Sequence, residues 1–485
     1  MKRAALAAAA LALAAAALAL VLMPTAAVAR GPDPNAQAVA DGCARETVGL
    51  SLRQVPEWVY VGDAERPATG PPPPLRSVAG IVGSRYDRWE AARPAGIDNP
   101  FTHLSYDEGI DVLPGGPYRE LIGGDPRART GNYAGRDDET ARLHLEWEQG
   151  ALPLWAWPDP GDRIAATGAW IWDCGHFGSG ERTELHPLQA LWVARRGLSV
   201  RSRRGESEGD LVIADTPTPA FRQEQCAHRT KGNRVVFTAC VLGPGAERPA
   251  VAGTYRFALS LPPRPSSRAR ATVRVAERGS RGAFRFSVRR RGTRVAVVVR
   301  IGRRPNVLVA KQVFAGWSVA PRLVHLRLRL RRLHVRGALD PSEVRSGGQT
   351  MPPGEWLAYV DAGGSWRMWR PRVRLVDTGQ TIRLHDAFDL YVRPGGRWRL
   401  AFFTRECDYG AAGSAYSRTR PIYPCPRTSE FGNLAGDDVP GAVVVRAGTR
   451  SVARRRVDAL TEDSTCPPRL RHGCFWLEFS IARVR

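Results

Sequence analysis

The chain has 485 residues and a formal net charge of +24 at pH 7, with 43% hydrophobic and 24% charged residues. This composition supports a packed core and excludes wholesale disorder, and the length corresponds to two or three domains. The only apolar run long enough to span a bilayer lies at the N-terminus, which excludes a polytopic helical membrane protein.

The N-terminal segment has the pattern of a secretory signal peptide. Two basic residues precede an uninterrupted apolar run over 4–23, which ends at Pro24. Ala27 and Ala29 then form an A-x-A cleavage site, so we expect residues 1–29 to be removed. The alternative is an uncleaved anchor helix. Both interpretations place the body of the chain outside the cytoplasm, secreted or associated with the cell envelope, and after cleavage we expect no transmembrane span.

Four segments are expected after the signal peptide. Residues 30–75 have the composition of an irregular, proline-rich arm ending in the tetraproline 71–74, a stiff spacer. We expect a Trp- and His-rich β domain over 76–250, a proline-marked linker over 251–267 and a β-sandwich domain over 268–485. The predicted fold class is all-β, a small barrel or sheet domain followed by a β-sandwich domain, stapled by disulfides.

The cysteines favour an oxidising compartment. Eight occur, an even number, all after the signal peptide and none in a C-x-x-C motif. For eight cysteines, sequence alone leaves about 105 pairings open. Proximity favours Cys226–Cys240, Cys407–Cys425 and Cys466–Cys474, which leaves Cys43–Cys174 as a long closure.

One group of residues in the first domain is suited to metal binding. Four of the nine histidines fall within residues 103–186, and Glu184 and His186 are two apart, so they share one face of a strand. Imidazole with carboxylate suits zinc, manganese or iron, and a water on such a metal can hydrolyse an ester. The alternative is a satisfied polar network in a tryptophan-rich core. The candidate ligands are Asp173, His176, Glu184, His186 and His144.

The stretch 170–176, followed by 184–187, resembles a family of uncharacterised secreted bacterial proteins with a W-[IV]-x-D-x-x-H … E-[IL]-H-P signature. The resemblance covers roughly residues 140–195. It implies that this segment forms one unit, and it implies no activity. The matching residues include Asp173, His176, Glu184, His186 and Pro187.

The positive charge is concentrated in one stretch. Residues 261–336 contain 20 Arg and Lys311 against a single acid, Glu277, whereas residues 98–162 contain 13 acids against 5 Arg. Charge asymmetry of this kind points to an anionic partner or to an internal dock for the acidic segment.

Two segments of the basic stretch alternate apolar and polar residues. The period of two over 284–289 and 326–331 predicts strands with one buried face and one arginine-bearing face. Such a face can bind an anionic polymer or lipid headgroups, with nucleic acid the least favoured partner. The alternative is a solvated sheet face. The candidate anion-binding residues are Arg285, Arg289, Arg327, Arg329 and Arg331.

Turn signals mark several strand pairs. We expect a strand pair within 163–194, a hairpin over 357–369 turning at 362–364, and a second hairpin over 390–402 turning at 394–396.

The sandwich domain carries acids at expected strand ends. This layout is similar to calcium-dependent lipid-binding sandwiches, in which loop aspartates hold the ion, and the alternative is that these residues form turns. They are Asp340, Asp361, Asp377, Asp386, Asp389, Asp408, Asp437 and Asp438.

Three functional hypotheses follow. The first is a non-enzymatic exported β-protein that binds an anionic envelope component through its arginine-bearing strands. The second is a metal-dependent hydrolase, and the third is a calcium-stabilised adhesion or lipid-binding module, so zinc and calcium are the candidate cofactors. The chain has no G-x-S-x-G, H-E-x-x-H, P-loop or G-x-G-x-x-G motif, and the sequence assigns no catalytic residue.

Overall fold

The computed structural model confirms the all-β class. Its strands are numbered β1 to β23, and two short 3-10 helices, η2 (Gly116–Leu121) and η3 (Leu154–Ala156), lie between them. Among the residues that the structure describes, no helix is long and apolar enough to cross a bilayer. The described residues are 58–60, 75–83, 108–122, 142–147, 152–173, 183–195, 203–214, 226–231, 234–240, 252–303, 307–338, 354–364, 366–406, 441–460, 466 and 470–484. The predicted signal peptide and nearly all of the predicted arm lie outside them.

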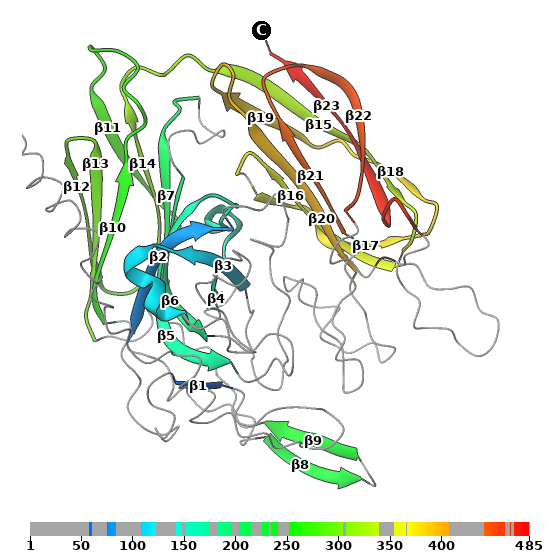
Figure 1. Ribbon diagram of the computed structural model, residues 1–485, viewed down its shortest axis with the longest axis horizontal. Coiled ribbons are helices and arrows are strands. Elements are labelled where there is room, and N and C mark those ends of the chain that lie inside the picture. The colour runs from blue at the N-terminus through cyan, green and yellow to red at the C-terminus, as the bar shows by residue number, and fades with distance from the viewer. Residues whose placement is uncertain are drawn as a thin grey trace, which may run out of the picture.

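Five strands close a small barrel within the predicted first domain (Figure 1). They are β2 (Arg76–Val82), β3 (Glu108–Pro114), β4 (Leu143–Trp147), β5 (Arg163–Asp173) and β6 (Thr183–Arg195). β2 pairs with β3 and β5, β3 with β4, β4 in parallel with β6, and β6 returns to β5. These pairings close the sheet on itself in the order β2–β3–β4–β6–β5.

The pleat of the barrel strands decides which residues face outward. Leu143, Leu145 and Trp147 on β4 and Leu185 on β6 are buried in the barrel core. Because neighbouring residues on a strand point to opposite faces, the residues that alternate with these four along β4 and β6 lie on the outer face of the barrel.

Strand β6 also belongs to a neighbouring β-sandwich. Its C-terminal half pairs with β7 (Ser207–Ala214), which continues the sheet to β14 (Leu308–Trp317) and β11 (Ala271–Glu277). The facing sheet is β10 (Gly253–Ser260), β13 (Arg294–Ile301) and β12 (Phe284–Arg291). Trp192 of β6 stacks on Phe257 with ring centroids 5.4 Å apart. Gly209 makes room for that indole, since a Cβ there would lie 2.2 Å from it.

The stretch 251–267, predicted as a linker, contains strand β10. Tyr255, Phe257 and Leu259 alternate with exposed residues and are buried in the sandwich core. The linker prediction is wrong for this part because the prolines begin only after the strand ends. In addition, β14 pairs with β7, so the two predicted domains share one sheet.

The C-terminal part forms a second β-sandwich. One sheet contains β15 (Val324–Val335), β18 (Thr381–Arg383), β19 (Ala387–Val392), β22 (Val452–Asp458) and β23 (Phe475–Arg483). The other contains β16 (Gly354–Ala362), β17 (Trp366–Val376), β20 (Trp398–Glu406) and β21 (Gly441–Ala447). Trp356, Phe402 and Phe475 meet edge to face between the sheets. This unit confirms the predicted sandwich class, and its first strand is β15, because β11 to β14 belong to the preceding sandwich.

The predicted turns have different outcomes. The strand pair within 163–194 is confirmed as β5–β6, and the hairpin over 357–369 as β16–β17. The second hairpin, over 390–402, is wrong because β19 pairs with β15 whereas β20 pairs with β16 and β21. The turn at 394–396 therefore joins the two sheets instead of two neighbouring strands.

The C-terminal sandwich packs against the barrel. Tyr359 of β16 lies in the barrel core cluster, with its ring centroid 5.4 Å from that of Trp157. Arg399 on β20 forms an ion pair with Asp159 at 3.3 Å. The barrel and the C-terminal sandwich therefore share a buried contact.

The cysteine predictions fall partly within the described residues. Cys466–Cys474 is a disulfide, as predicted. Cys226 and Cys240 stand opposite each other in the hairpin of β8 (Cys226–Lys231) and β9 (Arg234–Cys240). The other four cysteines, Cys43, Cys174, Cys407 and Cys425, lie outside the described residues.

The predicted arm contributes one described strand, β1 (Trp58–Tyr60), which pairs with β5.

Candidate functional site

A cluster of histidines and carboxylates lies on the outer face of the barrel. Strand register places Asp111 of β3 opposite His144 of β4, and His144 opposite Glu184 of the parallel strand β6. Glu146 and His186 follow two residues later on their strands, so they lie on the same face. Five side chains from three neighbouring strands therefore share one face.

Two histidines of this cluster each contact carboxylates. His144 Nδ1 lies 2.8 Å from Asp111 Oδ1, and His144 Nε2 lies 3.2 Å from Glu146 Oε1. His186 Nδ1 lies 3.0 Å from the other oxygen of Glu146. The contacts form a chain that runs across the three strands.

The cluster is largely withdrawn from solvent. Glu184 is 1% exposed, Glu146 and His186 are buried, and His144 and Asp111 are half-buried. One ligand atom each from His144, Glu146 and Glu184 lies within 4.8 Å of the others. This set is the only group of three or more such side chains found among the described residues. Burying an ionised group costs free energy unless a partner of opposite charge is present, so the buried carboxylates of this cluster need such partners.

The structure brings together part of the metal site predicted from the sequence. His144, Glu184 and His186 lie in the cluster. Asp173 ends β5 and its side chain lies outside the description, as does all of His176. Sequence reasoning missed Glu146 and Asp111. The period-two spacing of His144 and Glu146 was a usable signal, but the position of Asp111 depends on strand register. Hydrolysis at this cluster stays a prediction.

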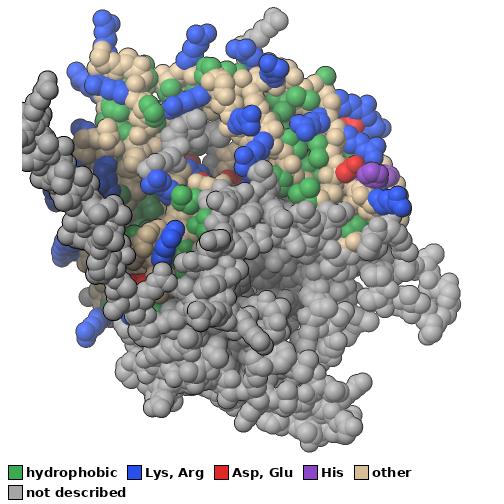
Figure 2. Space-filling model, viewed as in Figure 1, with side chains coloured by type: hydrophobic (Ala, Val, Ile, Leu, Met, Phe, Trp, Pro, Cys, Tyr) green, Lys and Arg blue, Asp and Glu red, His purple; other side chains and the backbone are tan. Residues whose placement is uncertain are grey.

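The candidate anion-binding residues fall on two different sandwiches. Arg285 and Arg289 lie on β12, and Arg327, Arg329 and Arg331 lie on β15. In both strands the arginines are exposed, whereas Leu326, Leu328 and Leu330 of β15 are buried. The predicted alternation is confirmed. Figure 2 shows many basic side chains (blue) and few acidic ones (red) over the described part of one face.

A bulge in β15 gathers additional arginines. The register between β15 and β23 shifts between Leu330 and Arg332. As a result Arg331 and Arg332 are both exposed, although successive residues of a regular strand point to opposite faces. Across the sheet Arg332 stands opposite Arg383 of β18 on one side and Glu478 of β23 on the other.

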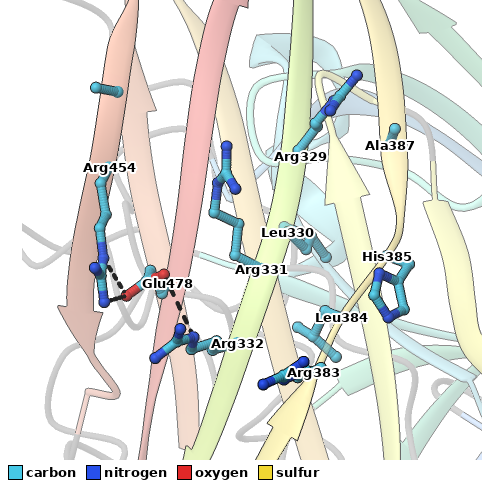
Figure 3. Close-up of a pocket in the computed structure, with 11 residues that line it drawn as sticks. Arg329, Leu330, Arg331, Arg332, Arg383, Leu384, His385, Ala387, Arg454 and Glu478 are labelled. Atoms are coloured by element: carbon cyan, nitrogen blue, oxygen red, sulfur yellow. Dashed lines mark hydrogen bonds and ion pairs between the residues drawn. The ribbon is translucent and has the colours of Figure 1, made fainter.

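These arginines line a groove of about 760 Å³ on the sheet surface (Figure 3). Five arginines, a histidine and one acid contribute, and the close-up shows their side chains arranged around the bulge of β15. They are Arg329, Arg331, Arg332, Arg383, Arg454, His385 and Glu478. We refer to this site as the basic groove.

Glu478 anchors part of the basic groove. Its side chain is 5% exposed and accepts hydrogen bonds from Arg454, with Nη2 at 2.6 Å, while Arg332 Nε lies 4.0 Å away. Arg331 Nε donates to Ser480 Oγ at 2.9 Å.

Arg329 and Arg331 are the two residues of the groove that sequence reasoning identified. Arg332, Arg383 and Arg454 were missed, and the Arg331–Arg332 pair, which interrupts the alternation, was the available signal for a bulge.

Arg327 is engaged beside the groove. Its Nε lies 3.2 Å from Asp389 Oδ1, and His325 Nε2 lies 2.9 Å from the same oxygen. The hydrogen bond from Arg327, followed by that from His325, lowers the pKa of the Asp389 carboxyl. Arg327 does not line the groove.

The aspartates predicted to hold calcium do not form a cluster among the described residues. Asp361 is buried in β16, and Asp389 is held by Arg327 and His325. Asp340, Asp408, Asp437 and Asp438 lie outside the described residues. A calcium site in those loops stays a prediction.

Comparisons with known proteins give little. No protein-family model and no curated protein matches the chain. Among solved structures, a C2 domain of a plant extended synaptotagmin 1 aligns with 10% identity over 33% of this chain and 93% of that domain, with a TM-score of 0.19. A score of this size establishes no shared fold.

Proposed function

We propose that this protein is an exported, non-enzymatic binder of phosphate-bearing anions and that the basic groove is its binding site. The observation that carries the proposal is the convergence of five arginines from β15, β18 and β22 on one groove that holds a single, buried acid. Such an excess of fixed positive charge attracts anions and raises their local concentration.

The chemistry of the groove suits phosphate. A guanidinium presents a planar fork of donors that matches phosphate oxygens, and it is more weakly hydrated than an ammonium group. Arg332 and Arg454 keep 47% and 63% of their side chains exposed while they contact Glu478, so both can reach a ligand.

The size of the groove indicates the scale of the ligand. Its volume of about 760 Å³ falls within the usual range for small-ligand sites, roughly 300–1,000 Å³. A lipid headgroup, or a short segment of an anionic envelope polymer, fits this volume. Among the described residues that line the groove there is no Phe, Tyr or Trp, which makes base stacking, and hence nucleic acid, a poorer match.

The test uses the purified full chain without a purification tag and two phosphate-bearing probes. One is a vesicle containing phosphatidylglycerol, compared with phosphatidylcholine alone, and the other is soluble linear polyphosphate. Binding is expected to weaken as salt rises, because exposed charges are screened. Vesicle binding without polyphosphate binding identifies the headgroup as the ligand, and the reverse identifies a polymer phosphate.

A matched pair of variants separates the groove from general charge. Replacing Arg329, Arg331 and Arg383 with Ser is expected to reduce affinity by about tenfold or more, since each loses a direct contact. Replacing Arg285, Arg289 and Arg300 with Ser removes the same charge from the β12–β13 face and is expected to change affinity less than about threefold. Equal losses in the two variants, or binding that ignores salt, contradict the proposal.

A further inference from the structure

We propose that His144, Glu146 and Glu184 are the three protein ligands of a divalent transition-metal ion, with zinc the first candidate. The site lies on the outer face of the barrel, separate from the basic groove. It differs from the metal site expected from the sequence. Glu146 is a ligand in place of Asp173, His176 and His186, and Asp111 and His186 become supporting residues.

The spacing of the ligand atoms fits a metal. Metal–nitrogen and metal–oxygen bonds of about 2.0–2.2 Å at tetrahedral angles put neighbouring ligand atoms roughly 3.3–3.6 Å apart. His144 Nε2 and Glu146 Oε1 are 3.2 Å apart, and the three ligand atoms lie within 4.8 Å of one another. A small movement of side chains is enough to close the set on one ion.

The orientation of His144 favours a ligand role. Its Nδ1 lies 2.8 Å from Asp111 Oδ1, and the tautomer that donates from Nδ1 to this carboxylate presents the Nε2 lone pair to an ion bound beside Glu146. A carboxylate behind a ligating histidine is the usual arrangement in metal sites, because it fixes the tautomer and makes the ring a better donor.

Glu146 has the same kind of support. One of its oxygens lies beside His144 Nε2, and the other accepts from His186 Nδ1 at 3.0 Å. His186 therefore positions the carboxylate from behind. At least two of the three proposed ligands have a second residue that orients them, as expected of a built site.

Strand geometry supplies the third ligand. Glu184 stands opposite His144 in the parallel β4–β6 pair and is 1% exposed. One imidazole and two carboxylates suit zinc, manganese or iron. Three protein ligands leave a fourth position for water or a ligand.

The test is titration of the tag-free, chelator-treated full chain with Zn²⁺ by calorimetry, with Co²⁺ as a spectroscopic substitute. One equivalent is expected to bind. His144→Ala and Glu184→Gln are expected to weaken Zn²⁺ binding by at least about 100-fold, and Asp111→Asn and His186→Ala by about 10–100-fold. The visible absorption spectrum of bound Co²⁺ is expected to differ between the wild-type chain and each of these variants.

Two controls keep the result interpretable. His325→Ala disrupts another histidine–carboxylate contact, with Asp389 at 2.9 Å, and is expected to leave Zn²⁺ affinity unchanged. Glu184→Gln preserves the shape of the side chain, and its melting temperature with chelator shows whether the fold survives. Zn²⁺ should raise the melting temperature of the wild-type chain and not that of folded Glu184→Gln.

Two outcomes overturn the proposal. One is a folded wild-type chain that binds neither Zn²⁺ nor Co²⁺. The other is Zn²⁺ binding that is the same in the wild-type chain, His144→Ala and Glu184→Gln.

Discussion

The two arginine-bearing strands, β12 and β15, follow the same alternation but have different neighbours. β12 is the last strand of a three-stranded sheet, and its Arg285 stands opposite Arg300 of β13. β15 is central in its sheet, with β23 on one side and β18 and β19 on the other. It contains a bulge, and its neighbours supply further arginines and a buried acid.

The difference shows what alternation does and does not determine. The period of two decides which side chains are exposed in both strands, although the inward residues of β12 are half-buried and those of β15 are fully buried. Whether the exposed charges converge depends on the strands alongside, which come from distant parts of the sequence. For this reason the proposed anion-binding site is on the β15 surface, and the β12–β13 face serves as its control.

The largest expected effect tests whether the two surfaces rest on comparable cores. Leu330 is buried between Arg329 and Arg331, and Val297 is buried beneath the β12–β13 face. Leu330→Ala is expected to cost about 2–5 kcal/mol of local stability, because it removes buried methyl groups and leaves a cavity. Val297→Ala removes fewer atoms and is expected to cost roughly 1–3 kcal/mol.

Hydrogen exchange of peptides from β15 and from β13 measures the loss of local stability in each sandwich separately. Arg329→Ser serves as the surface control and is expected to stay within about 0.5 kcal/mol of the wild-type chain. A loss below that level in Leu330→Ala would mean that the inward face of β15 is not a core.

The next-largest expected effect concerns Glu478, the acid of the basic groove. Glu478 is buried in the basic groove and accepts from Arg454. Glu478→Gln is expected to lower stability by about 1–3 kcal/mol, because a charged, buried hydrogen bond is weakened. It is also expected to raise the affinity of the groove for polyphosphate, because the negative charge is removed and Arg332 and Arg454 are released.

Opposite signs for stability and binding are what distinguish this prediction. Unfolding by denaturant and polyphosphate titration of the same preparation measure the two quantities. If Glu478→Gln lowers both, Glu478 is needed to align the arginines, and its charge does not compete with the ligand.

Local patterns predicted the strands well. The alternation over 326–331 and the turn at 362–364 depend on neighbouring residues, and both predictions are confirmed. The turn at 394–396 was assigned to a hairpin because a turn signal does not specify the sheet to which the next strand belongs. Closure of the barrel was predicted only in outline, since the parallel β4–β6 pair depends on tertiary structure.

The candidate sites were predicted in part for the same reason. Glu184 and His186 could be grouped because they lie two residues apart on one strand. Asp111 is 33 residues from His144 and meets it only through the β3–β4 register. Likewise Arg383 and Arg454 reach the basic groove from strands far from β15 in sequence. Sequence patterns identify residues on one strand, and strand pairing adds the rest.

The smallest expected effect concerns Glu277, an acid on β11 in the sandwich to which β6 also belongs. It pairs with Lys311, and its side chain is 56% exposed. The hydrogen bond from Lys311, followed by that from Ser280, lowers the pKa of Glu277 from 4.5 to about 2. Because the folded-state pKa is the lower one, the stabilisation is complete above about pH 4.5 and is lost as pH falls through about 2.

Glu277→Gln is therefore expected to cost less than about 1 kcal/mol near pH 7, since solvent screens an exposed pair. The difference from the wild-type chain should vanish near pH 2, where the folded carboxyl gains its proton. Hydrogen exchange of peptides from β11, compared at the two pH values, measures this. A cost that persists at pH 2 would show that Glu277 acts by packing instead of charge. The loss should also leave polyphosphate binding unchanged, in contrast to Glu478→Gln, because Glu277 does not line the basic groove.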